Sequence, residues 1–157
     1  MLFLGHIGFT AFIVSMIYLP ALAGIIGALL PDAIDKGLFI LGFAPCPRFI
    51  AHSLLAVPVA GIITYAVTRN KKMALALTIG WLLHLLEDMQ GMLPLFYPIK
   101  TYPFLQACGE IHILFTPYFI VTEAIGALLI IFVFGFSGKF IEFRRKVWKF
   151  IYSISRK

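Results

Sequence analysis

Charge is scarce in this sequence. Only 13% of its 157 residues are Asp, Glu, Lys or Arg, whereas 61% are hydrophobic, and the mean hydropathy is +0.98. A water-soluble domain of this length could not bury so much apolar surface, so lipid is the expected solvent. We therefore expect one compact membrane domain with no separate soluble module.

No basic segment precedes the first hydrophobic stretch, and that stretch is too long for a cleavable signal peptide, so we expect no cleaved leader. The net charge of +6 does not indicate a nucleic-acid partner, because seven of the thirteen basic residues fall in the last 21 positions. A basic tail beside a membrane helix is expected to bind anionic lipids. These residues are Lys139, Arg144, Arg145, Lys146, Lys149, Arg156 and Lys157.

A backbone in lipid must satisfy its own hydrogen bonds, so the expected fold class is all-α, a polytopic helical bundle with about four spans. We expect residues 1–136 to form the transmembrane domain and residues 137–157 to form a basic amphipathic helix at the interface. The candidate spans are residues 2–30, 49–67, 73–86 and 111–136. The apolar face of the interfacial helix would comprise Phe140, Phe143, Val147, Trp148, Ile151 and Ile154.

Basic residues also predict the orientation. By the positive-inside rule, the turn TRNKK at residues 68–72 and the basic tail should both be cytoplasmic, in the inner membrane of a prokaryote. Residues 31–52 and 84–110, together with His112, would then gather at the outer face.

The first hydrophobic segment allows two arrangements. A straight helix from His6 to Asp32 would be about 39 Å long and would leave His6 on the cytoplasmic side. A turn between Pro20 and Gly24 would instead give a re-entrant hairpin that returns His6 to the outer face. Both arrangements are open on geometry, because proline more often kinks a helix than ends it.

Imidazole and carboxylate groups lie in the predicted outer layer. A single Asp at the centre of a membrane helix would cost about 2.5–3.5 kcal/mol, and the cost falls nearer the interface. This combination suits Zn²⁺, Mn²⁺ or Fe²⁺. His84 and Asp88 are four residues apart and share a helix face, so they can bind one ion, with Glu87 beside them as a base or water-orienting group. The set is His6, His52, His84, His112, Asp32, Asp35, Glu87, Asp88 and Glu110. Taken singly, each histidine could be an ordinary interfacial side chain, and each acid a solvated cap.

Four stretches, at residues 5–11, 29–35, 48–55 and 80–98, together resemble a known family. Their sequences are GHIGFTA, LLPDAID, RFIAHSLL and GWLLHLLEDMQGMLPLFYP. The order resembles the small bacterial and archaeal family of membrane-bound metal-dependent hydrolases, of the LexA-binding, inner-membrane-associated type. More distantly, it is similar to zinc-dependent phospholipase C and P1-type nucleases, which are all-α enzymes that hydrolyse phosphoesters.

The resemblance implies that five residues are metal ligands: His6, Asp32, His52, His84 and Asp88. It also favours the hairpin, because His6 must then reach the outer face. The chain departs from the family pattern at Pro47, where the family has His, and at Ala51, where it has Thr. The spacing that precedes Asp35 is also one residue longer than in the family. The missing His is consistent with one metal ion rather than two, or with loss of activity.

Three further features keep alternative interpretations. Cys46 and Cys108 fall in predicted outer loops, where they could form a disulfide, remain free thiols or bind metal. Arg48 could bind a phosphate or anchor a helix at the interface. Glu123 lies within a predicted span and could pair with a lysine or a backbone group, line a cavity or stay protonated.

The sequence thus favours a membrane-embedded hydrolase that depends on a divalent metal, with Zn²⁺ as the leading ion, bound singly or as a pair. Its substrate would be a lipid or lipid-linked phosphoester, with Glu87 or Asp35 as the base. His112 is a further candidate ligand from topology alone. The alternative is a non-enzymatic transporter or scaffold whose His and Asp cluster binds a metal ion. A transporter would spread its ionisable groups through the bilayer depth, whereas these gather at predicted helix ends.

Overall fold

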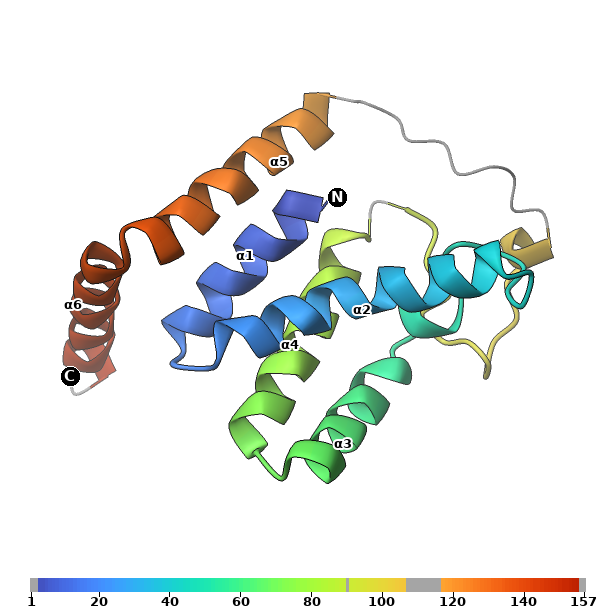
Figure 1. Ribbon diagram of the computed structural model, residues 1–157, viewed down its shortest axis with the longest axis horizontal. Coiled ribbons are helices and arrows are strands. Elements are labelled where there is room, and N and C mark those ends of the chain that lie inside the picture. Colours follow the sequence, from blue (N-terminus) through green and yellow to red (C-terminus); the bar gives the residue numbers. More distant parts are fainter. Residues whose placement is uncertain (1–2, 90, 107–116, 156–157) are drawn as a thin grey trace.

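The chain forms a bundle of helices in the computed structural model, which describes residues 3–89, 91–106 and 117–155 (Figure 1). Within these ranges it contains no strand, so the all-α prediction is confirmed. The α-helices are α1 Phe3–Met16, α2 Ala21–Ile40, α3 Ala56–Thr68, α4 Lys71–Glu87, α5 Pro117–Ile130 and α6 Ser137–Ser155. Short 3-10 turns are η1 Ile50–His52 and η2 Pro103–Gln106, and a π-helical segment, η3 Ile131–Gly135, continues α5.

The first hydrophobic segment is two helices, not one. The chain turns between α1 and α2, where Tyr18 adopts a left-handed φ of 60° and the Leu19 amide donates to the Val14 carbonyl. Pro20 directly precedes α2, a position where its missing amide hydrogen costs no helical bond. The straight-helix alternative is therefore wrong, and α1 folds back beside α2 (Figure 1).

Helix α2 continues further than the hairpin alternative predicted, through Pro31 to Ile40. Close backbone contact with α4 holds α2 in place. A Cβ atom added to Gly27 would lie 2.1 Å from the Leu77 carbonyl oxygen, and one added to Gly80 would lie 2.0 Å from that of Gly24. Only glycine permits so close an approach of two helices.

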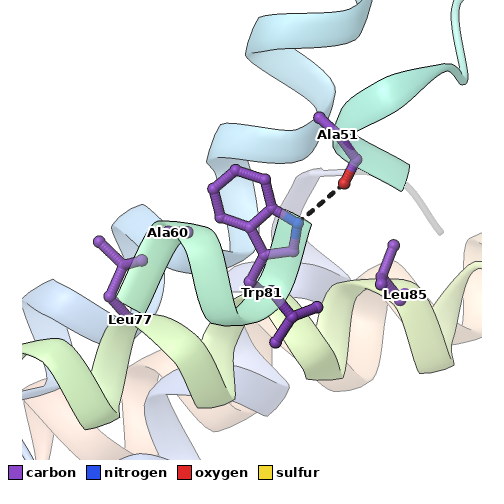
Figure 2. Close-up of a cluster of buried hydrophobic side chains, with 6 residues drawn as sticks. Ala51, Ala60, Leu77, Trp81 and Leu85 are labelled. Carbon is purple, nitrogen blue, oxygen red and sulfur yellow. Dashed lines mark hydrogen bonds between the residues drawn. The ribbon is translucent and has the colours of Figure 1, made fainter. Parts of the chain in front are cut away.

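Helices α3 and α4 form a hairpin around an apolar cluster (Figure 2). The buried Trp81 side chain lies at its centre, and its indole N–H donates to the Ala51 carbonyl oxygen at 2.8 Å. This bond satisfies the polar atom of Trp81 and ties η1 to α4. The cluster is Ala51, Val57, Ala60, Leu77, Trp81 and Leu85.

On the other side of α1 lies α5 (Figure 1). Gly8 and Gly126 allow close backbone contact between the two helices. The Glu123 carboxylate of α5 accepts the backbone N–H groups of Leu4 at 2.8 Å and of Gly5 at 3.0 Å. Glu123 therefore pairs with backbone groups, one of the alternatives left open by the sequence, and it caps the N-terminus of α1.

One helical stretch in the described part of the chain, Pro117–Gly135, is long and apolar enough to cross a membrane. Its 19 residues would extend about 28 Å, close to the thickness of the hydrocarbon core. Helices α1 and α3 are apolar but shorter. The expectation of about four spans is therefore not confirmed.

Helix α6 forms where an amphipathic helix was expected, and the start of its apolar face packs against the rest of the protein. Phe140 is buried against Phe12 and Phe132, with ring centroids 6.0 and 5.6 Å away. Arg144 and Trp148 donate to carbonyl groups at the end of α1, those of Ser15 and Met16 respectively. Ile151 and Ile154, further along α6, are exposed.

Cys46 is buried and disulfide-bonded, which removes the free-thiol and metal-ligand alternatives for it. Cys108, Glu110 and His112, on which other predictions rested, lie outside the described residues.

Candidate metal centre

Three segments meet and bring histidines and carboxylates together. Asp32 comes from α2, His52 from η1, and His84 and Asp88 from the end of α4. One potential ligand atom from each of these four side chains lies within 4.8 Å of all the others. The two histidines and Asp88 are buried, whereas the Asp32 side chain is 26% exposed. The cluster is therefore enclosed by protein and opens beside Asp32.

Nitrogen atoms of two imidazoles face each other within the cluster. The Nε2 atoms of His52 and His84 are 3.1 Å apart, and Oδ1 of Asp32 lies 3.5 and 3.9 Å from them. Two ligands on a tetrahedral Zn²⁺ ion are about 3.3 Å apart, given bonds of about 2.0–2.1 Å. The spacing of this trio thus matches the edges of a small coordination polyhedron.

Each aspartate of the cluster uses one oxygen for a cationic side chain and presents the other to imidazole. The Lys36 ammonium donates to Oδ2 of Asp32 at 2.6 Å, and the Arg48 guanidinium donates to Oδ2 of Asp88 at 2.6 Å. Oδ1 of Asp32 faces His52 and His84. Oδ1 of Asp88 lies 3.6 Å from Nε2 of His6. These ion pairs fix which oxygen is directed at the site.

Asp35 lies behind His52 and organises it. Its completely buried carboxylate accepts the backbone N–H groups of Phe49, Ala51 and His52 at 2.6–3.1 Å, and His52 Nδ1 at 2.7 Å. An imidazole that donates its Nδ1 hydrogen to a carboxylate keeps the lone pair on Nε2, the atom that faces the cluster. Asp35 is therefore placed to orient a ligand, and its oxygens are occupied, which argues against the predicted role of base.

Glu87 holds His6 in the same manner. Oε2 of Glu87 contacts Nδ1 of His6 at 2.5 Å, which directs the buried Nε2 of His6 toward Asp88. That Nε2 atom has no hydrogen-bond partner among the described residues. The His6 ring also lies 4.3 Å from that of His84, centroid to centroid. An unpaired buried nitrogen beside a carboxylate fits a place where a cation would bind.

Electrostatics at His52 also favour a positive charge in the cluster. Burial alone would lower the pKa of His52, but hydrogen bonds and charges from Asp32 and Asp35 raise it above its ordinary value. The surrounding carboxylates thus stabilise a cation at this position, which can be a proton or a metal ion.

The five residues implied as ligands, His6, Asp32, His52, His84 and Asp88, are brought together, with His6 at the edge of the group. Sequence reasoning missed the role of Lys36, although its spacing of four residues from Asp32 on one helix was a signal. Arg48, considered for phosphate binding, contacts Asp88, and its side chain is 38% exposed. The mixture of nitrogen and oxygen donors suits Zn²⁺, Mn²⁺ or Fe²⁺.

The model of a family described as YdjM inner membrane protein matches residues 1–152. No curated protein and no solved structure matches the chain.

Proposed function

We propose that this chain, which belongs to the YdjM inner membrane protein family, is a membrane-embedded, metal-dependent hydrolase of a lipid or lipid-linked phosphoester. His6, Asp32, His52, His84 and Asp88 would hold the divalent ion, with Zn²⁺ as the leading candidate. The observation that carries the proposal is the convergence of potential ligand atoms from two imidazoles and two carboxylates within 4.8 Å of one another.

A bound divalent ion would supply a hydroxide-like water at neutral pH and polarise a phosphoryl oxygen. The protein would contribute by orienting the side chains that hold the ion. Asp35 and Glu87 keep His52 and His6 in the tautomers that present Nε2. Lys36 and Arg48 hold the Asp32 and Asp88 carboxylates ionised and oriented.

Arg48 is also the proposed phosphate contact. One of its terminal nitrogens binds Asp88, and the partly exposed guanidinium carries further N–H donors that a phosphate oxygen could accept. Glu87 is the preferred candidate base. The oxygens of Asp35 already accept backbone N–H groups, and the Asp35 side chain is completely buried. Glu87 retains 10% exposure beside the cluster.

The arrangement supports a reaction site more than a transport pathway. The described histidines and the carboxylates that contact them gather where α1, α2, η1 and α4 meet, and Glu123, which lies within the candidate span, caps a helix. A metal-storing membrane protein would use the same cluster without hydrolysis, and this is the alternative to be tested.

The test is phosphate release from the full chain in lipid nanodiscs, after chelation and reloading with Zn²⁺, Mn²⁺ or Fe²⁺. A panel of phospholipids and polyprenyl phosphates provides substrates. We expect one metal and one substrate class to give release that is lost in Asp32→Ala and retained in Glu142→Ala, an exposed acid on α6. Equal release by the native chain and Asp32→Ala would contradict hydrolysis at this site, and metal binding without release would support the storage alternative.

A further inference from the structure

A cavity of about 410 Å³ opens between α2, α3 and α4. Its volume lies within the range of about 300–1,000 Å³ that is typical of ligand sites. Most of the residues around it are aliphatic, including Leu30, Ile34, Val59, Ile63 and Leu77. Figure 2 shows part of the wall, where Trp81 lies beside Ala60 of α3 and reaches toward Ala51.

The polar side chains that line this cavity already have partners within the protein. The Ser53 hydroxyl donates to the Ile50 carbonyl, that of Thr64 donates to the Ala60 carbonyl, and the Trp81 indole donates to the Ala51 carbonyl. Each of these donor hydrogens is therefore already in a hydrogen bond within the protein. A ligand here would be recognised by its apolar surface rather than by hydrogen bonds from these side chains.

One end of the cavity adjoins the candidate metal centre. Ala51 directly precedes His52, and Trp81 is one helical turn before His84. From Trp81, the cavity follows α4 back to Leu77, about 6 Å along the helix axis. Helix α3 accompanies it as far as Thr64. The cavity thus leads from the proposed phosphoester site along the hairpin toward the basic turn.

We propose that this cavity holds one hydrocarbon chain of the lipid phosphoester whose phosphate lies at the His and Asp cluster. The assignment of the phosphate rests on the proposed function, whereas binding of the chain rests on the cavity itself. A partner helix, about 10 Å across, would not fit within this volume. A lipid chain does fit, and the exposed rim residues Val59 and Ile63 would give it a lateral entrance.

The chain offers its own reporter, because Trp81 and Trp148 are its only tryptophans and only Trp81 lines the cavity. In a Trp148→Phe background, the purified full chain in detergent is treated with chelator and titrated with an alkyl phosphate that carries two bromine atoms on its hydrocarbon chain. Bromine quenches tryptophan fluorescence only on close approach. We expect saturable quenching of Trp81, stronger for bromines near the phosphate than for bromines at the chain end.

The matched variants are Thr64→Phe and Thr68→Phe. Both threonines are half-buried on α3 and donate to the carbonyl four residues earlier, but only Thr64 lines the cavity. We expect Thr64→Phe to weaken binding of the long-chain probe at least tenfold and Thr68→Phe to leave it within twofold. Quenching that does not saturate, or that responds equally to both variants, would overturn the proposal.

The two proposals fail separately, because the titration is made without metal. Saturable, Thr64-dependent quenching by a chain that neither retains metal nor releases phosphate would support the cavity and contradict the hydrolase. Metal-dependent phosphate release with quenching indifferent to Thr64→Phe would do the reverse.

Discussion

The acidic side chains at the cluster divide into two kinds by what their oxygens contact. Asp32 and Asp88 each give one oxygen to a basic side chain and direct the other at imidazole. Asp35 and Glu87 instead bind the Nδ1 atoms of His52 and His6. A metal centre needs both kinds, because an outer carboxylate fixes the tautomer of the histidine that binds the ion.

Replacing Asp35 with Asn tests this division. The amide would meet backbone N–H donors with its own N–H₂ group and would no longer fix the His52 tautomer. We expect metal affinity, measured by calorimetric titration, to fall about 10–100-fold. Stability should also fall, by about 1–3 kcal/mol for unpaired buried groups.

The control for this change is Glu142→Gln, which alters an exposed carboxylate on α6 that pairs with Lys146. It should leave metal affinity unchanged. Undiminished affinity in Asp35→Asn would contradict the orienting role.

The residues of the centre were easier to predict than their roles. His84 and Asp88 could be paired from their spacing on one helix, and family resemblance added His6, Asp32 and His52. Spacing could not show that Asp35 faces the backbone of η1, because that contact depends on how a loop folds back on α2. Spacing also could not show which oxygen of Asp32 faces the imidazoles, because that depends on which oxygen Lys36 binds.

At the scale of elements, α1 delivers His6 to the cluster, and two contacts hold α1 in place. At its start, Glu123 accepts the amides of Leu4 and Gly5. At its end, Arg144 and Trp148 of α6 donate to its last carbonyl groups. Both are favourable at helix termini, an acid at the N-terminus and a cation at the C-terminus.

Glu123→Ala should therefore loosen the helix that carries His6. We expect a loss of about 0.5–2 kcal/mol, the usual value of an N-terminal cap, together with faster amide hydrogen exchange at the start of α1. Glu123→Gln, which keeps an acceptor oxygen, should lose less. If exchange in α1 were the same in Glu123→Ala and in the native chain, the capping role would be contradicted.

Glycine contacts between α2 and α4 provide a sharper pair of variants on one helix. Gly27→Ala would place a methyl group against the Leu77 carbonyl, whereas Gly37→Ala would meet no atom within 4 Å. Thermal unfolding in detergent should show a loss of about 1–3 kcal/mol for Gly27→Ala. Gly37→Ala should be neutral or stabilising by up to about 1 kcal/mol. Equal effects would show that the helices do not approach so closely.

The helices themselves could largely be predicted from hydrophobic runs, and their ends less well. Residues 73–86 correspond closely to α4, which begins after the Asn70 cap. Residues 49–67 were expected to be one helix, but η1 occupies their start because Asp35 binds the backbone there. The turn before α2 could not be distinguished from a kink, since Pro20 is compatible with both.

At the scale of the molecule, the surface indicates a lipid environment, although among the described residues a single helical stretch is long and apolar enough to cross a membrane. Many large apolar side chains are exposed, among them Ile62, Val67 and Leu128, each at least 66% accessible. Such a surface in water would favour aggregation. Membership of an inner membrane protein family agrees with lipid as the solvent.

Orientation across the membrane remains a prediction from charge. With the basic turn and tail in the cytoplasm, Lys72→Cys and Lys149→Cys should react with an impermeant maleimide only after the membrane is permeabilised. Lys100→Cys, on the predicted outer side, should react in intact cells. Reaction of Lys72→Cys in intact cells would invert the proposed topology and place the candidate centre at the cytoplasmic face.

The central claim is that the cluster binds a divalent cation, and metal content tests it most directly. The full chain, purified without chelator, should retain about one equivalent of a transition metal by plasma mass spectrometry, since folded ligands hold such ions tightly. His84→Ala/Asp88→Ala should retain almost none, while Glu142→Ala/Lys146→Ala, which removes an exposed ion pair, should match the native chain. Equal metal content in the native chain and the His84→Ala/Asp88→Ala variant, whether high or near zero, would contradict the account.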